Sequence, residues 1–292
     1  LPDGAAPSLA DDYELLHPLG AGGLGMVFEG RQRALDRHVA IKFLHPQLAK
    51  DALHRQRFAR EGQLMARWGH PHIVRVIDFR DSQQNPALVL ELIEGQPLSD
   101  VPSRPAAEEL TTARQIASAL AYAHADGVIH RDVCPDNVLL RHNGEALLAD
   151  FGIAAPATQP RITEGGAVLG RPIYMSPEQL DGQPPTTAMD LYALGLMLYQ
   201  RLCGEAPFCA ETVTALAALK VERRYRRLHE RRPELPMALD ELIHALLATD
   251  PDERPTAAAV EAQLRDLVAL CAGATPDGTT PAGTSPEESG RG

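Results

Sequence analysis

The stretch from Val128 to Gly152 constrains the fold of this chain most strongly, because short apolar runs alternate in it with polar clusters. This pattern predicts two small strands, pinned to a core, that present Asp132, Asn137 and Asp150 along one edge. One carboxylate that handles a proton, together with an amide and a second carboxylate that hold Mg²⁺, is the minimum set for phosphoryl transfer from a nucleotide. The stretch therefore predicts a phosphoryl-transfer centre.

Composition and charge exclude several other classes of protein. The 292 residues are 44% hydrophobic and 23% charged, which is typical of a globular protein with a large core, as one domain or as two lobes. The net charge of -11 disfavours a surface that binds nucleic acid or an anionic membrane, because both of these partners are themselves negative. We therefore expect no nucleic-acid partner and no membrane contact within this stretch of chain.

The cysteines and the apolar segments predict a cytoplasmic location. The longest apolar stretch, around Leu191–Leu202, is too short to span a bilayer. The cysteines form no CxxC pair and no spacing suited to zinc, which fits a reducing compartment: Cys134, Cys203, Cys209 and Cys271. The chain is expected to be cytoplasmic, or to be the cytosolic part of a longer membrane-anchored protein.

A glycine-rich segment near the start of the chain predicts a hairpin over phosphates. Gly20, Gly22 and Gly25 have the G-x-G-x-x-G spacing, and in a Rossmann unit that motif would open a helix. Here a β-favouring Met-Val-Phe segment follows Gly25, so a strand–turn–strand is the better interpretation. The alternative is a tight glycine turn without a ligand.

Lys42 lies in the middle of the apolar strand predicted for His38–Leu44. A lysine is seldom buried without a partner, because removing its charge from water is costly. Glu61 is the candidate partner, since it falls on the apolar face of a helix predicted for Asp51–Trp68, which Asp51 can cap. The alternative is a surface helix on which Glu61 pairs with neighbouring arginines.

The secondary-structure pattern changes at Glu91–Gly95. Two strands are predicted before this point, at Ile73–Phe79 and Ala87–Leu92. Helices dominate after it: Ala106–Ala125, Asp190–Leu198, Glu211–Glu222, Ala238–Thr249 and Thr256–Ala272. This predicts an α+β fold with a small β-rich lobe at residues 12–93 and a larger α-helical lobe at residues 94–270. Residues 1–11 are expected to form a flexible leader and residues 271–292 a disordered tail or linker.

Taken together, these residues resemble one family, the eukaryotic-like (Hanks-type) protein Ser/Thr kinases in their bacterial branch. The matching positions follow the family's order through residues 13–270: Gly20, Gly22, Gly25, Val27, Val39–Lys42, Glu61, His130–Asp132, Asn137, Asp150–Gly152, Ser176–Glu178, Asp190, Gly195 and Arg254. The resemblance implies the bilobal protein-kinase fold and an ATP-dependent protein Ser/Thr kinase that acts on protein substrates.

The resemblance also implies roles at a nucleotide site. The glycine loop should cover the ATP phosphates, and Lys42, held by Glu61, should contact the α- and β-phosphates. Asp150 and Asn137 would ligate Mg²⁺, with Mn²⁺ as an alternative ion, and Asp132 would orient the substrate hydroxyl. The adenine site would be formed by side chains and hinge backbone from Leu19, Val27, Ala40, Leu90, Glu91, Ile93 and Leu139.

Two structural sets and one regulatory segment complete what the resemblance implies. Met65, Val76, His130 and Phe151 match an apolar column that aligns the lobes, and Glu178 with Arg254 matches a buried ion pair. In the loop Ile153–Gly170, Thr163 is the best-placed phosphate acceptor, with Thr158 as a second, and Arg131 would receive the phosphate. Autophosphorylation of this activation loop could use a homodimer.

The chain departs from the family at two positions. The lysine expected two residues after Asp132 is Cys134, and the threonine expected after Gly170 is Arg171. We hypothesise that Arg171 supplies to the γ-phosphate the positive charge that Cys134 lacks. Cys134 is expected to be a buried, inert cysteine, and a redox switch is the alternative.

Two other functions compete with a protein kinase. The departures at Cys134 and Arg171 leave open a catalytically weak pseudokinase that acts as a nucleotide-binding scaffold or regulator. A small-molecule kinase of the aminoglycoside type shares the ATP core but lacks an activation segment that ends in a Pro-Glu motif. The segment from Thr163 to Glu178 therefore speaks against the small-molecule kinase.

Overall fold

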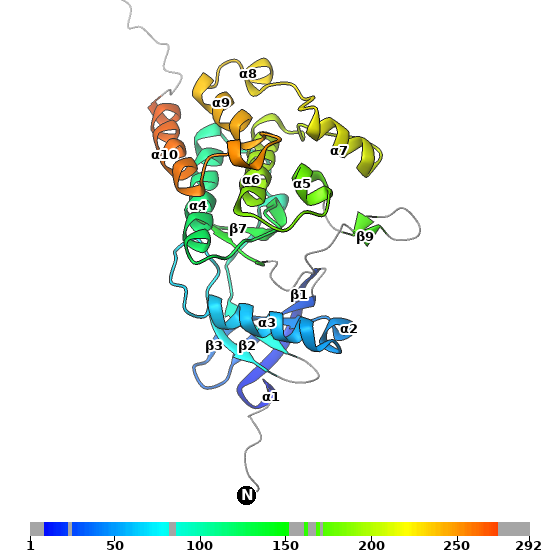
Figure 1. The fold of residues 1–292 in the computed structure, drawn as a ribbon. Helices are drawn as coiled ribbons and strands as arrows, with labels where there is room; N and C mark the ends of the chain where they lie inside the picture. The colour runs from blue at the N-terminus through cyan, green and yellow to red at the C-terminus, as the bar shows by residue number, and fades with distance from the viewer. Residues whose placement is uncertain are drawn as a thin grey trace, which may run out of the picture.

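The computed structural model describes residues 9–22, 25–81, 86–151, 161–162, 168–169 and 172–273. These residues form two lobes, a small one built on a five-stranded sheet and a larger one built of helices (Figure 1). The α+β, bilobal fold predicted from the sequence is confirmed.

The small lobe is an antiparallel sheet with one long helix. The strands have the spatial order β1-β2-β3-β5-β4 and the following bounds: β1 Tyr13–Gly22, β2 Gly25–Gln32, β3 Arg37–Leu44, β4 Val76–Arg80 and β5 Ala87–Glu91. Helix α3, Ala52–Met65, begins where predicted, because the side chain of Asp51 accepts a hydrogen bond from the Leu53 amide at 2.8 Å. Two short helices, α1 (Leu9–Asp12) and α2 (Pro46–Ala49), precede it, and α1 lies partly in the predicted leader.

The large lobe contains the remaining helices and a small sheet. Its helices are α4 Ala106–Ala125, α5 Pro177–Leu180, α6 Thr187–Cys203, α7 Val213–Val221, α8 Leu228–Arg231, α9 Met237–Leu246 and α10 Ala257–Gly273. A three-stranded sheet with the order β6-β7-β8 lies at the lobe junction: β6 Gly95–Pro97, β7 Val138–Arg141 and β8 Ala146–Leu148. The short strands β9 (Arg161–Ile162) and β10 (Val168–Leu169) pair with each other.

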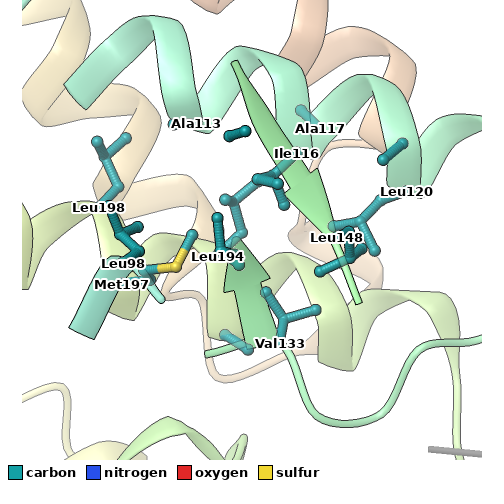
Figure 2. Packing of buried hydrophobic residues seen from close by; sticks show 14 of the residues in the cluster. Leu98, Ala113, Ile116, Ala117, Leu120, Val133, Leu148, Leu194, Met197 and Leu198 are labelled. Carbon is teal, nitrogen blue, oxygen red and sulfur yellow. The ribbon is translucent and has the colours of Figure 1, made fainter. Parts of the chain in front are cut away.

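The core of the large lobe lies between α4, α6 and the small sheet. Figure 2 shows Ile116 and Leu120 of α4 close to Leu148 of β8, and Leu194 of α6 beside them. Val133 belongs to the same buried cluster. Because Val133 directly follows Asp132, this core fixes the backbone of the candidate catalytic loop.

Several boundaries differ from the prediction for local reasons. The strand predicted to begin at Ile73 begins at Val76, because Ile73 instead forms an isolated parallel bridge with Leu148 of the other lobe. The 3₁₀ turns at Pro135–Asn137 (η2), Pro172–Tyr174 (η4) and Pro251–Glu253 (η5) each begin with a proline, which cannot donate a hydrogen bond and suits a first helical position.

Within the described ranges, no helix combines the length and the apolar character needed to cross a membrane.

Candidate active site

The start of helix α6 holds the loop that carries Asp132. Asp190, in the first turn of α6, is fully buried and accepts hydrogen bonds from the backbone N–H groups of His130 at 2.8 Å and Arg131 at 2.7 Å. The Nε2 atom of His124 lies 2.7 Å from the same carboxylate. Asp190 therefore fixes two consecutive peptide groups immediately before Asp132.

His130 connects this loop to the segment that follows β8. Its Nδ1 accepts a hydrogen bond from the Asp132 N–H at 3.3 Å, and its Nε2 donates to the carbonyl of Ala149 at 2.9 Å. Burial lowers the pKa of the His130 imidazole, and the charge of Asp190 only partly opposes this effect. The hydrogen-bond pattern assigns a neutral ring with its proton on Nε2. Its centroid lies 4.5 Å from that of Phe151.

Asn137 fixes the carboxylate of Asp132. The Asn137 Nδ2 group donates to the Asp132 carbonyl and to its Oδ2 atom, each at 2.8 Å. Asn137 lies at the end of η2, directly before β7, so the pairing of β7 with the small sheet positions it. Because both contacts use the amide nitrogen, the amide oxygen is the atom that Asn137 can offer to a cation.

Lys42 of β3 reaches Asp150. The Lys42 Nζ atom lies 2.8 Å from Asp150 Oδ1, and the lysine side chain is 7% exposed whereas the aspartate is 38% exposed. The sequence did not predict this contact, because the two residues lie in different lobes. The predicted partner, Glu61, belongs to α3, but its side chain lies outside the described residues. The pairing of Lys42 with Glu61 stays a prediction.

The oxygen donors of Asn137 and Asp150 fit a magnesium ion in a nucleotide site. The residues that the structure describes contain no cluster of three or more His, Cys, Asp and Glu suited to a metal ion. Mg²⁺ in phosphate-transferring sites is held by one or two carboxylates, while phosphates and waters complete its octahedron. One carboxylate and one amide oxygen are therefore a suitable protein contribution.

The predicted glycine hairpin is present. β1 and β2 are antiparallel, with Gly22 opposite Gly25. A Cβ atom at Gly25 would lie 1.7 Å from the carbonyl oxygen of Phe43, so the close approach of β3 requires glycine there. A Cβ atom at Gly20 would meet no described atom within 4 Å. Gly25 is thus needed by the sheet itself, and Gly20 is not.

Most of the residues predicted to contact adenine pack on one core, to which both lobes contribute. Ala40 of β3 pairs with Leu90 of β5, and both are buried in that core. Val27 of β2 and Leu139 of β7 are partly buried against it. Ile93 is also partly buried there, whereas Leu19 is 46% exposed. The Glu91 carboxylate accepts a hydrogen bond from the Arg75 amide at 3.0 Å, so its side chain is engaged within the protein.

The family model for the protein kinase domain matches residues 13–264. The chain belongs to the protein kinase family. It is 40% identical over 265 residues to the Ser/Thr-protein kinase PkaA of Streptomyces coelicolor, a match that covers 84% of this chain and 48% of the relative. It is 35% identical over 259 residues to PrkC of Bacillus subtilis, covering 87% of this chain and 40% of the relative. The chain is thus a bacterial Hanks-type catalytic domain that spans less than half the length of these curated relatives.

Solved kinase structures have the same fold. The kinase domain of Mycobacterium tuberculosis PknI is 28% identical, with a TM-score of 0.69 and coverage of 88% of this chain and 96% of that one. Rad53 in complex with AMP-PNP is similar in fold, with a TM-score of 0.73 at 23% identity over 89% of this chain and 66% of that one. The two lobes of Figure 1 therefore form the bilobal kinase fold.

The predicted ion pair of the kinase domain is confirmed. Arg254 donates to both carboxylate oxygens of Glu178, at 2.5 Å and 2.9 Å, and both side chains are buried. The same guanidinium donates to the carbonyls of Ala248 and Ala188. Next to this pair, Gln179 Nε2 donates to the carbonyl of Arg131 at 3.1 Å. Helix α5 is thereby joined to the catalytic loop.

Of the other residues predicted for the kinase domain, some are buried and the rest lie outside the described residues. The proposed apolar column is buried throughout, and its members come from α3, β4, the catalytic loop and the segment after β8: Met65, Val76, His130 and Phe151. Cys134 is fully buried, as predicted, and its inertness stays a prediction. The residues predicted to act in the activation loop lie outside the described residues: Thr158, Thr163 and Arg171.

The sequence pattern alone indicates no role for two residues that hold the catalytic loop. Asp190 matches only a family position in a buried helix, and His124 belongs to no recognised motif. A carboxylate within the otherwise apolar α6 is a usable signal, because a buried charge requires hydrogen-bond donors. The location of those donors, sixty residues earlier in the chain, cannot be read from the pattern.

Proposed function

We propose that this domain transfers the γ-phosphate of ATP to Ser or Thr hydroxyls of protein substrates, and that it phosphorylates its own activation loop at Thr163 or Thr158. The observation that carries the proposal is the fixed carboxylate of Asp132, which Asn137 holds at 2.8 Å on a loop anchored by Asp190. Kinase relatives that match most of this chain support the same activity.

In the proposed reaction, Asp132 orients the substrate hydroxyl and takes up its proton. A bond forms between the hydroxyl oxygen and the γ-phosphorus, the bond from that phosphorus to the β–γ bridging oxygen breaks, and ADP leaves. Lys42, with Glu61 as its proposed partner, binds the α- and β-phosphates beneath the glycine hairpin. Positioning and electrostatics, rather than covalent catalysis, supply the rate.

The remaining site residues bind the nucleotide and its metal ion. Asn137 and Asp150 would hold Mg²⁺, or Mn²⁺, and the bound ion would neutralise phosphate charge. Arg171 would contact the γ-phosphate in place of the lysine that Cys134 replaces. The adenine site would be lined by Leu19, Val27, Ala40, Leu90, Glu91, Ile93 and Leu139, with Gly20, Gly22 and Gly25 over the phosphates.

The wider assignments follow from the same proposal. The kinase domain would occupy residues 12–270, divided into lobes after residue 93, with a leader at residues 1–11 and a tail or linker at residues 271–292. The domain would act in the cytoplasm, either alone or as the cytosolic part of a membrane-anchored protein. Transfer between two copies in a homodimer would phosphorylate the activation loop.

The test compares the wild-type chain with Asp132→Asn. Each protein is incubated with γ-labelled ATP, Mg²⁺ and a generic basic protein, and the purified chains are examined by mass spectrometry. We expect label in the substrate, and phosphate on Thr163 or Thr158, only with the wild type. Because nucleotide binding does not use Asp132, ATP should raise the melting temperature of both proteins. ATP binding without label above the Asp132→Asn control would contradict the proposal and favour the nucleotide-binding pseudokinase.

A further inference from the structure

Lys220, near the end of α7, is fully buried. Its ammonium group donates hydrogen bonds to three backbone carbonyls, those of Pro172 at 3.1 Å, Ile173 at 2.9 Å and Met175 at 2.5 Å. A lysine ammonium has three donors, so these contacts use its full capacity. A lysine on α7 thus holds the backbone of a segment more than forty residues earlier in the sequence.

Within the described part of the chain, the buried positive charge of Lys220 has no carboxylate reserved for it, so the three carbonyls must compensate much of that charge. Glu178 of α5 is the acidic residue whose charge acts on it, but that carboxylate already binds Arg254 through both oxygens. On the α6 side lies the ring of Tyr192, whose centroid is 5.5 Å from the Lys220 Nζ atom and 4.7 Å from the Arg254 guanidinium carbon. The carbonyl dipoles therefore provide much of the compensation for the buried positive charge.

The segment held by Lys220 lies against the catalytic loop. Tyr174 and Met175 line a small cavity together with Arg131 and Asp132. The hydroxyl of Tyr174 donates to Gln200 of α6 at 2.5 Å, which fixes the other side of the segment. A shift of the carbonyls that Lys220 holds would therefore move residues next to the proposed catalytic carboxylate.

We propose that Lys220 is a positioning residue for the protein substrate: its ammonium group fixes residues 172–175 so that a bound peptide can reach Asp132. This inference rests on the proposed kinase function and deepens it, because it names a residue on which the use of protein substrates depends. The three hydrogen bonds of the Lys220 ammonium group go to backbone carbonyls of this segment, so Lys220 acts through the segment that it holds.

The proposal predicts a separation between peptide and nucleotide kinetics. In Lys220→Met the three carbonyls lose their donors, and the segment is no longer fixed. We expect KM for a peptide substrate to rise at least tenfold, while KM for ATP and the slow hydrolysis of ATP by water change less than twofold. Lys220→Arg retains a permanent charge and several donors and should restore most of the peptide affinity.

The matched control is Lys50→Met, which removes the exposed lysine that follows α2. It should leave both KM values unchanged. Melting curves of all variants establish that they are folded. If folded Lys220→Met retains the wild-type KM for peptide, the positioning role is refuted. If instead the wild type transfers no phosphate to any peptide, the proposed function itself fails, so the two failures are distinguishable.

A pH series on the wild type tests the same inference without a destabilising substitution. Burial lowers the pKa of the Lys220 ammonium to about 7, and Glu178 only partly opposes this effect. Below that pH all three donors are present, and above it one is lost. With a peptide that lacks His and Cys, KM should rise about fivefold to tenfold from pH 6.0 to pH 8.5, which lies within the range expected for the net contribution of one intramolecular hydrogen bond. The rise should be absent in Lys220→Arg. A flat wild-type profile, or an equal rise in Lys220→Arg, would overturn the proposal.

Discussion

Two non-glycine residues beside the proposed catalytic centre have left-handed backbone conformations, with φ of 71° at Arg131 and 57° at Asp150. Such conformations cost about 1–3 kcal/mol each when they are strained, although aspartate tolerates them better than most residues. At Arg131 the cost is offset by the hydrogen bond from its own N–H group to Asp190. At Asp150 the turn directs the carboxylate to Lys42. Asp36 and Arg223 also have positive φ, but of the described non-glycine residues with this conformation only Arg131 and Asp150 lie beside the proposed catalytic centre.

Arg171 is the residue whose proposed role depends most on the departure at Cys134. If its guanidinium contacts the γ-phosphate, Arg171→Ala removes a charged donor from the transition state. We expect kcat for peptide phosphorylation to fall about 10²- to 10³-fold, as for the loss of one oxyanion donor. KM for ATP should change little, because the α- and β-phosphates are bound elsewhere.

Steady-state kinetics with purified protein provide the measurement for Arg171. Arg171→Lys should retain part of the rate, because it keeps a positive charge without the planar pair of donors. Arg265→Ala is the matched control, since this exposed arginine of α10 pairs only with Glu261 among the ion pairs of the described residues. A kcat for Arg171→Ala within twofold of the wild type would remove the role proposed for Arg171.

At the scale of secondary-structure elements, long periodic segments were predictable and short ones were not. Helix α4 has the predicted bounds, Ala106–Ala125, because its apolar stripe repeats over many turns and proline precedes it. Strand β6 and helix α5 are three and four residues long, too short for a period to be recognised. Their positions depend on partners that are distant in the sequence.

The candidate site shows the same division. Asp132, Asn137 and Asp150 could be predicted from local spacing, because β7 and β8 form one short hairpin between them. The contacts of Asp190 and Lys220 could not be predicted, since most of their partners are backbone groups that lie about forty-five to sixty residues away. Every residue except proline has the same backbone N–H and C=O groups, so the residue types do not show which distant peptide groups a side chain will bind.

The contact between α6 and α9 gives a prediction at the element scale. A Cβ atom at Gly195 of α6 would lie 2.7 Å from the Leu246 Cβ of α9, so the helices approach closely at this point. In an exposed helix, Gly→Ala stabilises by about 1 kcal/mol. Here overpacking should exceed that gain, and we expect Gly195→Ala to lower the free energy of unfolding by about 1–3 kcal/mol.

Urea unfolding followed by circular dichroism measures this change. The control is Gly69→Ala, because a Cβ atom there would meet no atom within 4 Å in the described ranges. The control should unfold at the wild-type midpoint or slightly above it. If Gly195→Ala also unfolds at or above the wild-type midpoint, α6 and α9 do not require glycine for their packing.

At the scale of the whole molecule, residues 66–75 join the two lobes. The Val74 amide donates to the carbonyl of Leu148 at 3.0 Å, and the Leu148 amide donates to the carbonyl of His72 at 2.9 Å. These contacts connect the segment after α3 directly to β8 of the large lobe. Because β8 leads to Asp150, the same connection sets the position of the proposed metal ligand relative to Lys42 in the small lobe.

Trp68 is the largest side chain of this connection, and it makes two separable kinds of contact. Its Nε1 donates to Asp126 at 2.8 Å, just after α4, and its ring lies edge-on to Phe151 with centroids 5.1 Å apart. Trp68→Phe removes the hydrogen bond and keeps most of the packing, whereas Trp68→Ala removes both. We expect losses in the free energy of unfolding of about 1 kcal/mol for Trp68→Phe and about 3–5 kcal/mol for Trp68→Ala.

The activity of these variants distinguishes a general loss of stability from a specific loss of alignment. Phe151 directly follows Asp150, so a cavity at Trp68 should loosen the contact of Asp150 with Lys42 and lower kcat about tenfold or more in the fraction that remains folded. Trp68→Phe should keep kcat within about threefold of the wild type, because the ring that supports Phe151 is retained. Asp126→Ala is the control for the hydrogen bond, because alanine has no side-chain acceptor for Trp68 Nε1, and it should resemble Trp68→Phe in both measurements. Equal losses of kcat in Trp68→Phe and Trp68→Ala would contradict this account, since the packing on Phe151 would then not be what aligns the lobes.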